Sequence, residues 1–255
     1  MDNDVLQVIG VSKTFASRQR AVEAVKNVSL EIRAGECVGL VGESGCGKST
    51  LARLITRLED VDEGRILLCG EDITRLKGPA LRRAYRNVKM IFQDPRSSFD
   101  PRLTLGASIR EALRASGNLT RRERAAETLR LLGEVGLDPS YGKARPGEVS
   151  GGECQRAAIA RAIATRPRLL ICDEATSALD VSVQAQIMDL LRSLRRQYDM
   201  SFLFISHDLA LVSSFCDTVC VMRAGEIVER GPAEHIIRSP RHPYTQKLIG
   251  SVLEP

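Results

Sequence analysis

The sequence predicts an α/β fold with a mostly parallel sheet as its core, an antiparallel β subdomain and a helical insertion. Three observations support this fold class. From Val5 to Glu36, short runs alternate apolar and polar residues, which is typical of antiparallel strands. After residue 36, strands and helices follow one another in turn, which favours a parallel sheet covered on both faces. Between residues 104 and 166 the pattern is almost entirely helical, which indicates an insertion.

The expected elements follow in a regular order. Antiparallel strands are expected in VLQVIGV and AVKNVSLEI, with a loop at Ala16–Arg20. The buried strand ECVGLVG and the helix LARLITRL come next, and GRILLCG and VKMIFQD are expected to be further strands. Three helices form the insertion, and the second opens with Thr120 and Glu123, which fit a capping box. Strands and helices then alternate again in LLICDE, SVQAQIMDLLRSLRRQY, SFLFISH and LALVSSFC, and two strands follow in TVCVMR and EIVERG.

Length and composition indicate one domain with a sizeable core. With 43% hydrophobic residues, we expect all 255 residues (1–255) to form a single domain. Its parts are an α/β core at 1–94 and 166–230, a helical subdomain at 95–165 and a short C-terminal segment at 231–255. Apolar stretches of four residues are far below the roughly 20 that cross a bilayer, so no transmembrane segment is expected.

Charge and cysteine usage exclude several classes of protein. The net charge of +5 is spread along the chain and aromatic residues make up only 4%, so no nucleic-acid partner is expected. The seven cysteines are an odd number without a C-x-x-C pair, which fits neither a disulfide framework nor a zinc site. A reducing cytoplasm is therefore the expected location.

The stretch GESGCGKST at 42–50 predicts a phosphate-binding loop, because it fits G-x-x-x-x-G-K-[ST] between an expected strand and an expected helix. The glycines let backbone N–H groups converge on an anion at the positive end of the helix. Lys48 would reach the β- and γ-phosphates, Ser49 would bind Mg²⁺ and Thr50 would be a further phosphate donor. The residues of this stretch that are expected to bind a nucleoside triphosphate are Gly42, Glu43, Ser44, Gly45, Cys46, Gly47, Lys48, Ser49 and Thr50.

Two carboxylates end the buried strand LLICDE, at the edge where ligands bind in parallel sheets. Asp173 is expected on the Mg²⁺ side. Glu174 is expected to be the general base that accepts a proton from the water attacking the γ-phosphate. An ordinary acidic residue at a strand end is the alternative for each, and the neighbouring phosphate loop weakens it.

A second helix start with anion-binding character lies in VSGGECQR at 149–156. A serine and two glycines come directly before a long helical run. Ser150 taken alone is more readily explained as a plain N-cap.

Six motifs in a fixed order resemble the ATP-binding subunits of ABC transporters over nearly the whole chain. GESGCGKST is similar to their Walker A motif, SGGEC to their signature and LLICDE to Walker B. Gln93 in IFQDP matches the Q-loop, Asp180 in SALD the D-loop and His207 in ISHD the switch histidine. The import branch for oligopeptides, dipeptides and nickel is resembled by GLVGESGCGKSTLARL, MIFQDPRSSFDPR, SALDVSVQAQI and HPYTQKLIGSVL.

The resemblance implies a P-loop NTPase fold of the ABC type and a head-to-tail pair of ATPase subunits. ATP on one Walker A motif would be covered by the partner's signature loop, and Asp180 would line the seam. Here the signature residues are Ser150, Gly151, Gly152 and Glu153. His207 would contact the γ-phosphate on its own chain, and Gln93 would sense Mg²⁺ or the attacking water.

The resemblance also assigns the adenine and ribose contacts. Phe15 would stack on adenine, and Val25 would pack on the ribose side. A place in the core is the open alternative for Phe15.

The chain departs from the family pattern at three positions. Glu153 replaces the usual signature glutamine and is expected to point toward ribose, with phosphate contacts intact and a lowered rate as one outcome. Ala175 replaces a frequent proline, with little expected effect. Cys46 near a helix N-terminus is either a thiol open to modification without nucleotide or a small filler residue, and the filler is favoured.

The implied function is ATP hydrolysis, with ATP and Mg²⁺, that powers import of peptides, nickel or metal chelates through a membrane permease. The partners would be a second ATPase subunit, identical or different, the integral membrane permease subunits and, indirectly, an extracytoplasmic solute-binding protein. The chain would lie at the cytoplasmic face of the inner membrane. Two alternatives are a non-transport ABC ATPase acting on ribosomes or DNA and a nucleotide switch in a soluble assembly.

Overall fold

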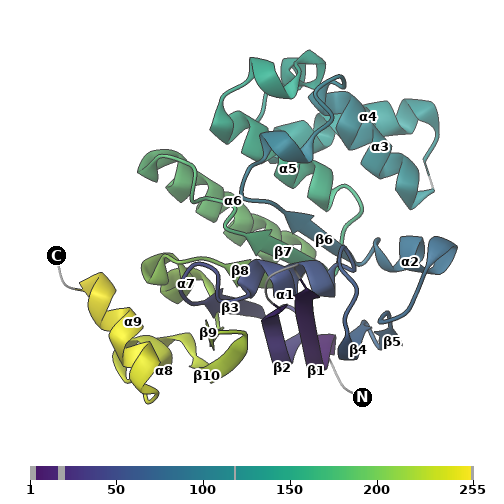
Figure 1. Ribbon diagram of the computed structural model, residues 1–255. Coiled ribbons are helices and arrows are strands. Elements are labelled where there is room, and N and C mark those ends of the chain that lie inside the picture. Colours follow the sequence, from purple (N-terminus) through teal and green to yellow (C-terminus); the bar gives the residue numbers. More distant parts are fainter. Residues whose placement is uncertain (1–3, 17–20, 118, 254–255) are drawn as a thin grey trace.

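The computed structural model describes residues 4–16, 21–117 and 119–253, and it confirms the predicted fold class (Figure 1). Its N-terminal part forms a four-stranded antiparallel sheet in the order β2-β1-β4-β5. The strands are β1 (Asp4–Ala16), β2 (Ala21–Arg33), β4 (Glu63–Leu68) and β5 (Glu71–Asp72). The predicted loop at Ala16–Arg20 lies outside the described residues after its first position.

The core is a six-stranded sheet in the order β10-β9-β3-β8-β7-β6. All its pairs are parallel except β9 with β10. The strands are β3 (Cys37–Val41), β6 (Val88–Ile91), β7 (Leu169–Asp173), β8 (Ser201–Ile205), β9 (Thr218–Arg223) and β10 (Glu226–Pro232). Every residue of β3, β7 and β8 is buried, which explains their continuous apolar sequences.

The two faces of this sheet pack into separate apolar layers. Along β7, Leu170 and Cys172 join one layer, whereas Leu169 and Ile171 join the other. Helices cover the first face, among them α6 (Val181–Tyr198) and α7 (Leu209–Phe215). The second face is covered by α1 (Lys48–Ile55) together with the antiparallel sheet. The sheet is therefore covered on both faces as expected, but helices alone do not cover the second one.

The helical block lies at the end of the molecule opposite to β1 and β2 (Figure 1). Its helices are α3 (Leu105–Ser116), α4 (Arg121–Glu134) and α5 (Gly151–Ile163). The capping box predicted at Thr120 and Glu123 is confirmed at the start of α4. Three short 3₁₀ helices accompany the α-helices: Arg96–Ser98, Pro139–Lys143 and Pro146–Glu148. The boundaries of the helical subdomain at 95 and 165 stay a prediction.

Three further helices were not predicted. One is α2 (Gly78–Ala84), which precedes β6. The others are α8 (Ala233–Arg238) and α9 (Pro243–Leu253), which lie beside β10 in Figure 1. No helix among the described residues combines the length and the apolar character needed to cross a membrane.

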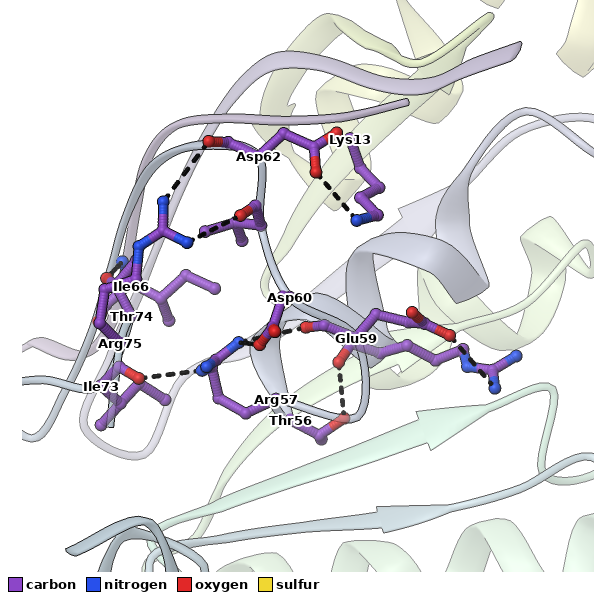
Figure 2. Close-up of polar contacts among 12 residues, drawn as sticks. Lys13, Thr56, Arg57, Glu59, Asp60, Asp62, Ile66, Ile73, Thr74 and Arg75 are labelled. Carbon is purple, nitrogen blue, oxygen red and sulfur yellow. Dashed lines mark hydrogen bonds and ion pairs between the residues drawn. The ribbon is translucent and has the colours of Figure 1, made fainter. Parts of the chain in front are cut away.

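Buried Arg57 fixes the end of α1 against the antiparallel sheet (Figure 2). Its Nε donates to the carbonyl of Ile73 at 3.0 Å, and its Nη1 donates to Asp60 Oδ1 at 2.7 Å and to the carbonyl of Glu59 at 3.3 Å. A buried guanidinium without such partners would be strongly destabilising, so these acceptors are needed for its burial. The helix that begins at the predicted phosphate loop is thereby held at its other end.

Candidate functional site

The loop between β3 and α1 has a backbone that only glycine permits at two points. Gly42 and Gly47 have φ angles of 153° and 112°. A Cβ atom at Gly42 would lie 2.1 Å from the carbonyl oxygen of Met222, and one at Gly47 would lie 2.2 Å from that of Ala24. The loop then enters α1, whose N-cap is Gly47 and carries no side-chain cap. The first amides of α1 are therefore not capped by a side chain and can bind an anion.

Lys48 folds back over this loop. Its side chain is buried, and its Nζ donates to the carbonyl of Gly42 at 2.8 Å and to that of Glu43 at 2.9 Å. An ammonium group has three donors, and the third one here has only the weak acceptor Cys46 Sγ, which a phosphate oxygen can replace. Cys46 is buried in the core with its Sγ 3.7 Å from Lys48 Nζ, which agrees with the small-filler interpretation.

A hydroxyl and a carboxylate meet where β7 ends. Ser49 Oγ donates to Oδ1 of Asp173 at 3.0 Å. Burial raises the pKa of Asp173, whereas the Ser49 hydrogen bond lowers it. A buried carboxylate of this kind is stabilised by a cation, and oxygen donors of this type suit Mg²⁺.

Glu174 follows in a left-handed backbone conformation with φ of 49°. Its N–H donates to the carbonyl of Ile205 at 3.0 Å, which fixes this turn against the end of β8. His207 lies two residues beyond β8, and its Nδ1 is 3.9 Å from Oε1 of Glu174. A left-handed conformation is strained for a non-glycine residue and here sets the direction of a site carboxylate.

A pocket of about 510 Å³ joins most of the predicted ATP site. Glu174 and Gln93, which follows β6, line it together with the loop. This arrangement follows from the parallel sheet, because the carboxyl ends of β3, β6, β7 and β8 share one edge. The predicted loop residues that line the pocket are Ser44, Gly45, Gly47, Lys48, Ser49 and Thr50. Lining residues that were not predicted are Val22, Glu23, Ala24, Lys26, Ala224 and Gly225.

The expected ribose contact of Val25 does not agree with the structure. Val25 is fully buried in the core, because a bulge with Asn27 at φ 46° puts Val25 on the same face as Val28. Val22 lines the pocket in its place and is 54% exposed. Phe15 pairs with Val22 in the strand register and is itself 41% exposed, so it lies beside a lining residue and outside the core, although it does not line the pocket itself.

The signature residues lie at the start of α5. Ser150 Oγ accepts a hydrogen bond from the N–H of Glu153 at 3.3 Å, and Oε2 of Glu153 accepts one from the N–H of Ser150 at 2.7 Å. The second carboxylate oxygen of Glu153 accepts a hydrogen bond from the Tyr141 hydroxyl. The expected direction of Glu153 toward ribose is therefore not observed, because both of its oxygens are bound within the chain.

The start of α5 packs beside the start of α6. A Cβ atom at Gly152 would lie 2.6 Å from Cγ1 of Val183, and one at Gly151 would lie 3.6 Å from Leu179. Asp180 is the N-cap of α6, and its Oδ1 accepts from the N–H of Val183 at 2.9 Å. The signature and the D-loop segment are thus neighbours, and neither is among the described residues that line the phosphate pocket.

Tyr244 at the start of α9 is a site contact that sequence reasoning missed. Its hydroxyl accepts a hydrogen bond from the N–H of Glu43 at 3.1 Å, which removes this amide from the expected phosphate donors. The two residues are 201 positions apart, and no local pattern connects them. Tyr244 belongs to the stretch HPYTQKLIGSVL, which indicates the import branch but no contact with the phosphate loop.

The family profile described as "ABC transporter" matches residues 25–177, which is more than half of the chain. The chain belongs to the ABC transporter family. A second profile, the C-terminal region of oligopeptide and dipeptide transporters, matches residues 228–255 and so covers β10, α8 and α9. The resemblance to ABC ATPases and to their oligopeptide import branch is thereby confirmed.

Several ABC proteins are similar to this ATPase over most of its length. The glutathione import ATP-binding protein GsiA of Pectobacterium atrosepticum is 46% identical, with 97% of this chain and 41% of that protein covered. A probable peptide ABC transporter ATP-binding protein, y4tS of Sinorhizobium fredii, is 48% identical, with coverages of 94% and 68%. The oligopeptide transport ATP-binding protein AppF of Bacillus subtilis is 44% identical, with coverages of 97% and 78%. The chain thus spans less than half of GsiA and more than two thirds of the other two.

Solved ABC cassettes share the fold of this ATPase. The dimeric structure of MJ0796, a bacterial ABC transporter cassette, has a TM-score of 0.82 at 28% identity and covers 89% of this chain and 98% of its own. A dimeric post-hydrolysis state of the same cassette, bound to ADP and Pi, has a TM-score of 0.80 at 27% identity, with the same coverages. Both of these cassettes were solved as dimers.

Proposed function

We propose that this chain is the ATP-hydrolysing subunit of an ABC importer for peptides. One observation carries the ATPase part: the phosphate loop, Gln93 and Glu174 line a single pocket, and Asp173 is hydrogen-bonded to Ser49 beside it. The match of residues 228–255 to the oligopeptide and dipeptide transporter region supports the import part, as do relatives named peptide or oligopeptide transport proteins. Nickel or metal chelates are the other cargo that the import branch takes.

The triphosphate would lie across the start of α1. The uncapped amides of the helix and the Lys48 ammonium supply positive charge where the transferred phosphoryl group develops negative charge. Phe15 and Val22 together offer an exposed apolar surface at the rim for the adenine ring. Gly42 and Cys46 are buried, so they belong to the packed base of the loop and not to its exposed surface.

Mg²⁺ fits the donors at this edge of the sheet. Ser49, Asp173 and Gln93 offer a hydroxyl, a carboxylate and an amide oxygen, which are ligands that Mg²⁺ prefers. When bound, the ion would neutralise charge on the β- and γ-phosphates. Burial raises the pKa of Asp173, and a bound cation would offset this cost by stabilising the ionised carboxylate.

Glu174 would accept the proton of the attacking water. Its carboxylate is only partly buried and lines the pocket, so a water molecule can reach it. His207 lies 3.9 Å away and is largely exposed, so its free movement allows contact with the γ-phosphate once nucleotide is bound. Ser150, Gly151 and Gly152 would act on the ATP of a second subunit, because they lie outside this chain's own pocket.

The transport assembly would consist of two ATPase subunits and integral membrane permease subunits, with this chain at the cytoplasmic face of the membrane. Dimeric solved cassettes with the same fold support the pairing. Gln93 connects the pocket to the helical block and would pass its state to the permease. A solute-binding protein on the other side would deliver the peptide.

Glu174→Gln tests the ATPase assignment. Loss of the general base should lower turnover about 10²- to 10⁴-fold while ATP still binds, so the variant should accumulate as an ATP-bound dimer. ATPase rate and size-exclusion chromatography with Mg-ATP measure both effects. Glu71→Gln on β5, which lies outside the pocket, is the matched control. Unchanged turnover in Glu174→Gln would refute the assignment.

The import part needs a test of its own. The chain should co-purify from solubilised source membranes with permease subunits, and mass spectrometry of solute on the associated binding protein should identify a peptide. Purification without any integral membrane partner would contradict the transport role and favour a soluble assembly.

A further inference from the structure

The C-terminal helix α9 contacts the phosphate loop through one side chain. The Tyr244 hydroxyl accepts a hydrogen bond from the N–H of Glu43 at 3.1 Å. The carbonyls of Gly42 and Glu43, on either side of this N–H, both accept hydrogen bonds from Lys48 Nζ, at 2.8 and 2.9 Å. A residue near the end of the chain therefore takes part in the architecture of the nucleotide site.

Tyr244 is itself held firmly. Its side chain is 6% exposed and packs in the main core, and the Arg223 guanidinium lies over its ring at 4.9 Å from the centroid. Its N–H donates to Nδ1 of His242 at 3.1 Å. Glu229 accepts from the N–H groups of Arg241 and His242 at 2.8 and 3.1 Å, which anchors the entry to α9 on β10. The hydroxyl is thus presented to the loop from a rigid base.

The contact reaches Lys48 through two consecutive peptide groups. The Glu43 N–H donates to Tyr244, and the carbonyl of Glu43 accepts from Lys48 Nζ at 2.9 Å. Each peptide group is planar, and the φ and ψ angles of Glu43 alone relate the two contacts. Fixing the N–H therefore restricts where the carbonyl can point and, with it, where the ammonium group rests.

We propose that Tyr244 is a positioning residue for nucleotide binding: its hydroxyl sets the phosphate loop so that Lys48 is held in place for the β- and γ-phosphates. This inference rests on the proposed ATPase function. It assigns to the C-terminal region, residues 228–255, a structural link to the ATP site of its own chain.

Tyr244→Phe is the test, because it removes the hydroxyl and keeps the ring under Arg223. The affinity for Mg-ATP, measured by titration calorimetry, should fall about three- to tenfold, which corresponds to one lost hydrogen bond. KM for ATP should rise by the same factor, whereas kcat at saturating ATP should stay unchanged. Hydrogen exchange of the Glu43 amide, followed without nucleotide, should become faster.

Tyr85→Phe is the matched control. Its hydroxyl donates to the carbonyl of Arg57 at 3.3 Å, beyond the far end of α1, and Tyr85 is not among the described residues that line the pocket, so this variant loses one side-chain hydrogen bond away from the phosphate loop. This variant should bind Mg-ATP like the unaltered chain. Equal losses in both variants, or unchanged binding in Tyr244→Phe beside an unaltered chain that binds normally, would overturn the positioning role alone. No Mg-ATP binding by the unaltered chain would overturn the proposed function and this inference together.

Discussion

Two helices of this ABC ATPase begin with a glycine-rich, anion-binding sequence, and their first turns are occupied differently. At α1, the N-cap Gly47 has no side chain to offer, so the first amides have no side-chain acceptor. At α5, Ser150 and Glu153 form a complete capping box, and Tyr141 also binds Glu153. The first helix start is open to a ligand, whereas at the second the N–H groups of Ser150 and Glu153 are already bonded to side chains of the same turn.

The difference separates two kinds of anion site. The α1 site needs only this chain, since Lys48, Ser49 and Asp173 already surround it. The α5 start keeps the Ser150 hydroxyl proton and the amides of Gly151 and Gly152 as donors, while the amide of Glu153 is already bonded to Ser150. These remaining donors suit a nucleotide that is bound to a second subunit and reaches α5 only when the two subunits associate.

The largest expected effect is that of Ser150→Ala. It removes the hydroxyl that we propose to donate to the γ-phosphate held by a second subunit, and loss of such a preorganised donor should lower kcat about 10²- to 10³-fold. Mg-ATP binding to the separate subunit should stay unchanged, because Ser150 is not part of that pocket. Steady-state turnover and calorimetry measure the two quantities.

Thr120→Ala is the control for this variant, because it breaks the same kind of capping box at α4. Both variants should lose similar stability, with a missing N-cap typically worth about 1 kcal/mol. Turnover should fall only in Ser150→Ala. An equal fall in both would show that Ser150 acts through helix stability alone.

Lys48→Ala should have the next largest effect, on the other side of the comparison. Loss of a charged donor to phosphate is worth about 1.5–3 kcal/mol, so Mg-ATP should bind roughly 10- to 150-fold more weakly to the separate subunit. Lys89→Ala, which removes a half-buried lysine of β6 outside the pocket, should leave the affinity unchanged. Full affinity in Lys48→Ala would contradict the self-contained nature of the α1 site.

The smallest effect is expected at Glu153. Hydrogen bonds from Tyr141 and Ser150 lower the pKa of this carboxyl. A lowered pKa in the folded chain means that the carboxylate stabilises the fold above its unfolded pKa, and that this stabilisation disappears as the pH falls through the folded value. Glu153→Ala should therefore lower the melting temperature by a few degrees at neutral pH and by less in acid.

Glu153→Gln sharpens this result. Glutamine can also close a capping box, so the variant should melt close to the unaltered chain and turn over ATP at the same rate. A large change of turnover in Glu153→Gln would mean that the carboxylate breaks its capping-box hydrogen bonds and contacts the nucleotide.

The sequence predicted what is encoded locally. The phosphate loop, the two carboxylates at the end of β7 and the capping box at Thr120 are each formed by residues that are close in sequence, so their spacing determines the local geometry. Parallel strands then bring Gln93 and Glu174 to one pocket by topology. The sheet that covers the second face of the core follows from packing and was only partly foreseen.

The wrong predictions concern residues whose position depends on a one-residue shift of strand register or on a contact with a residue distant in sequence. The bulge at Asn27 turns Val25 into the core, although simple alternation from Val28 would place it on the opposite face. Glu153 satisfies its own helix instead of a ligand, which the signature pattern alone does not reveal. Tyr244 meets Glu43 across the length of the chain, and a single sequence carries no signal for such a pair.

The folded-back side chain of Lys48 lowers the entropy cost of nucleotide binding. A lysine loses about 2 kcal/mol of rotamer entropy when it is immobilised, and here folding has already ordered it against Gly42 and Glu43. Nucleotide that arrives meets a charge that needs little further ordering. More of the free energy of triphosphate binding is then available for the proposed association of two ATPase subunits.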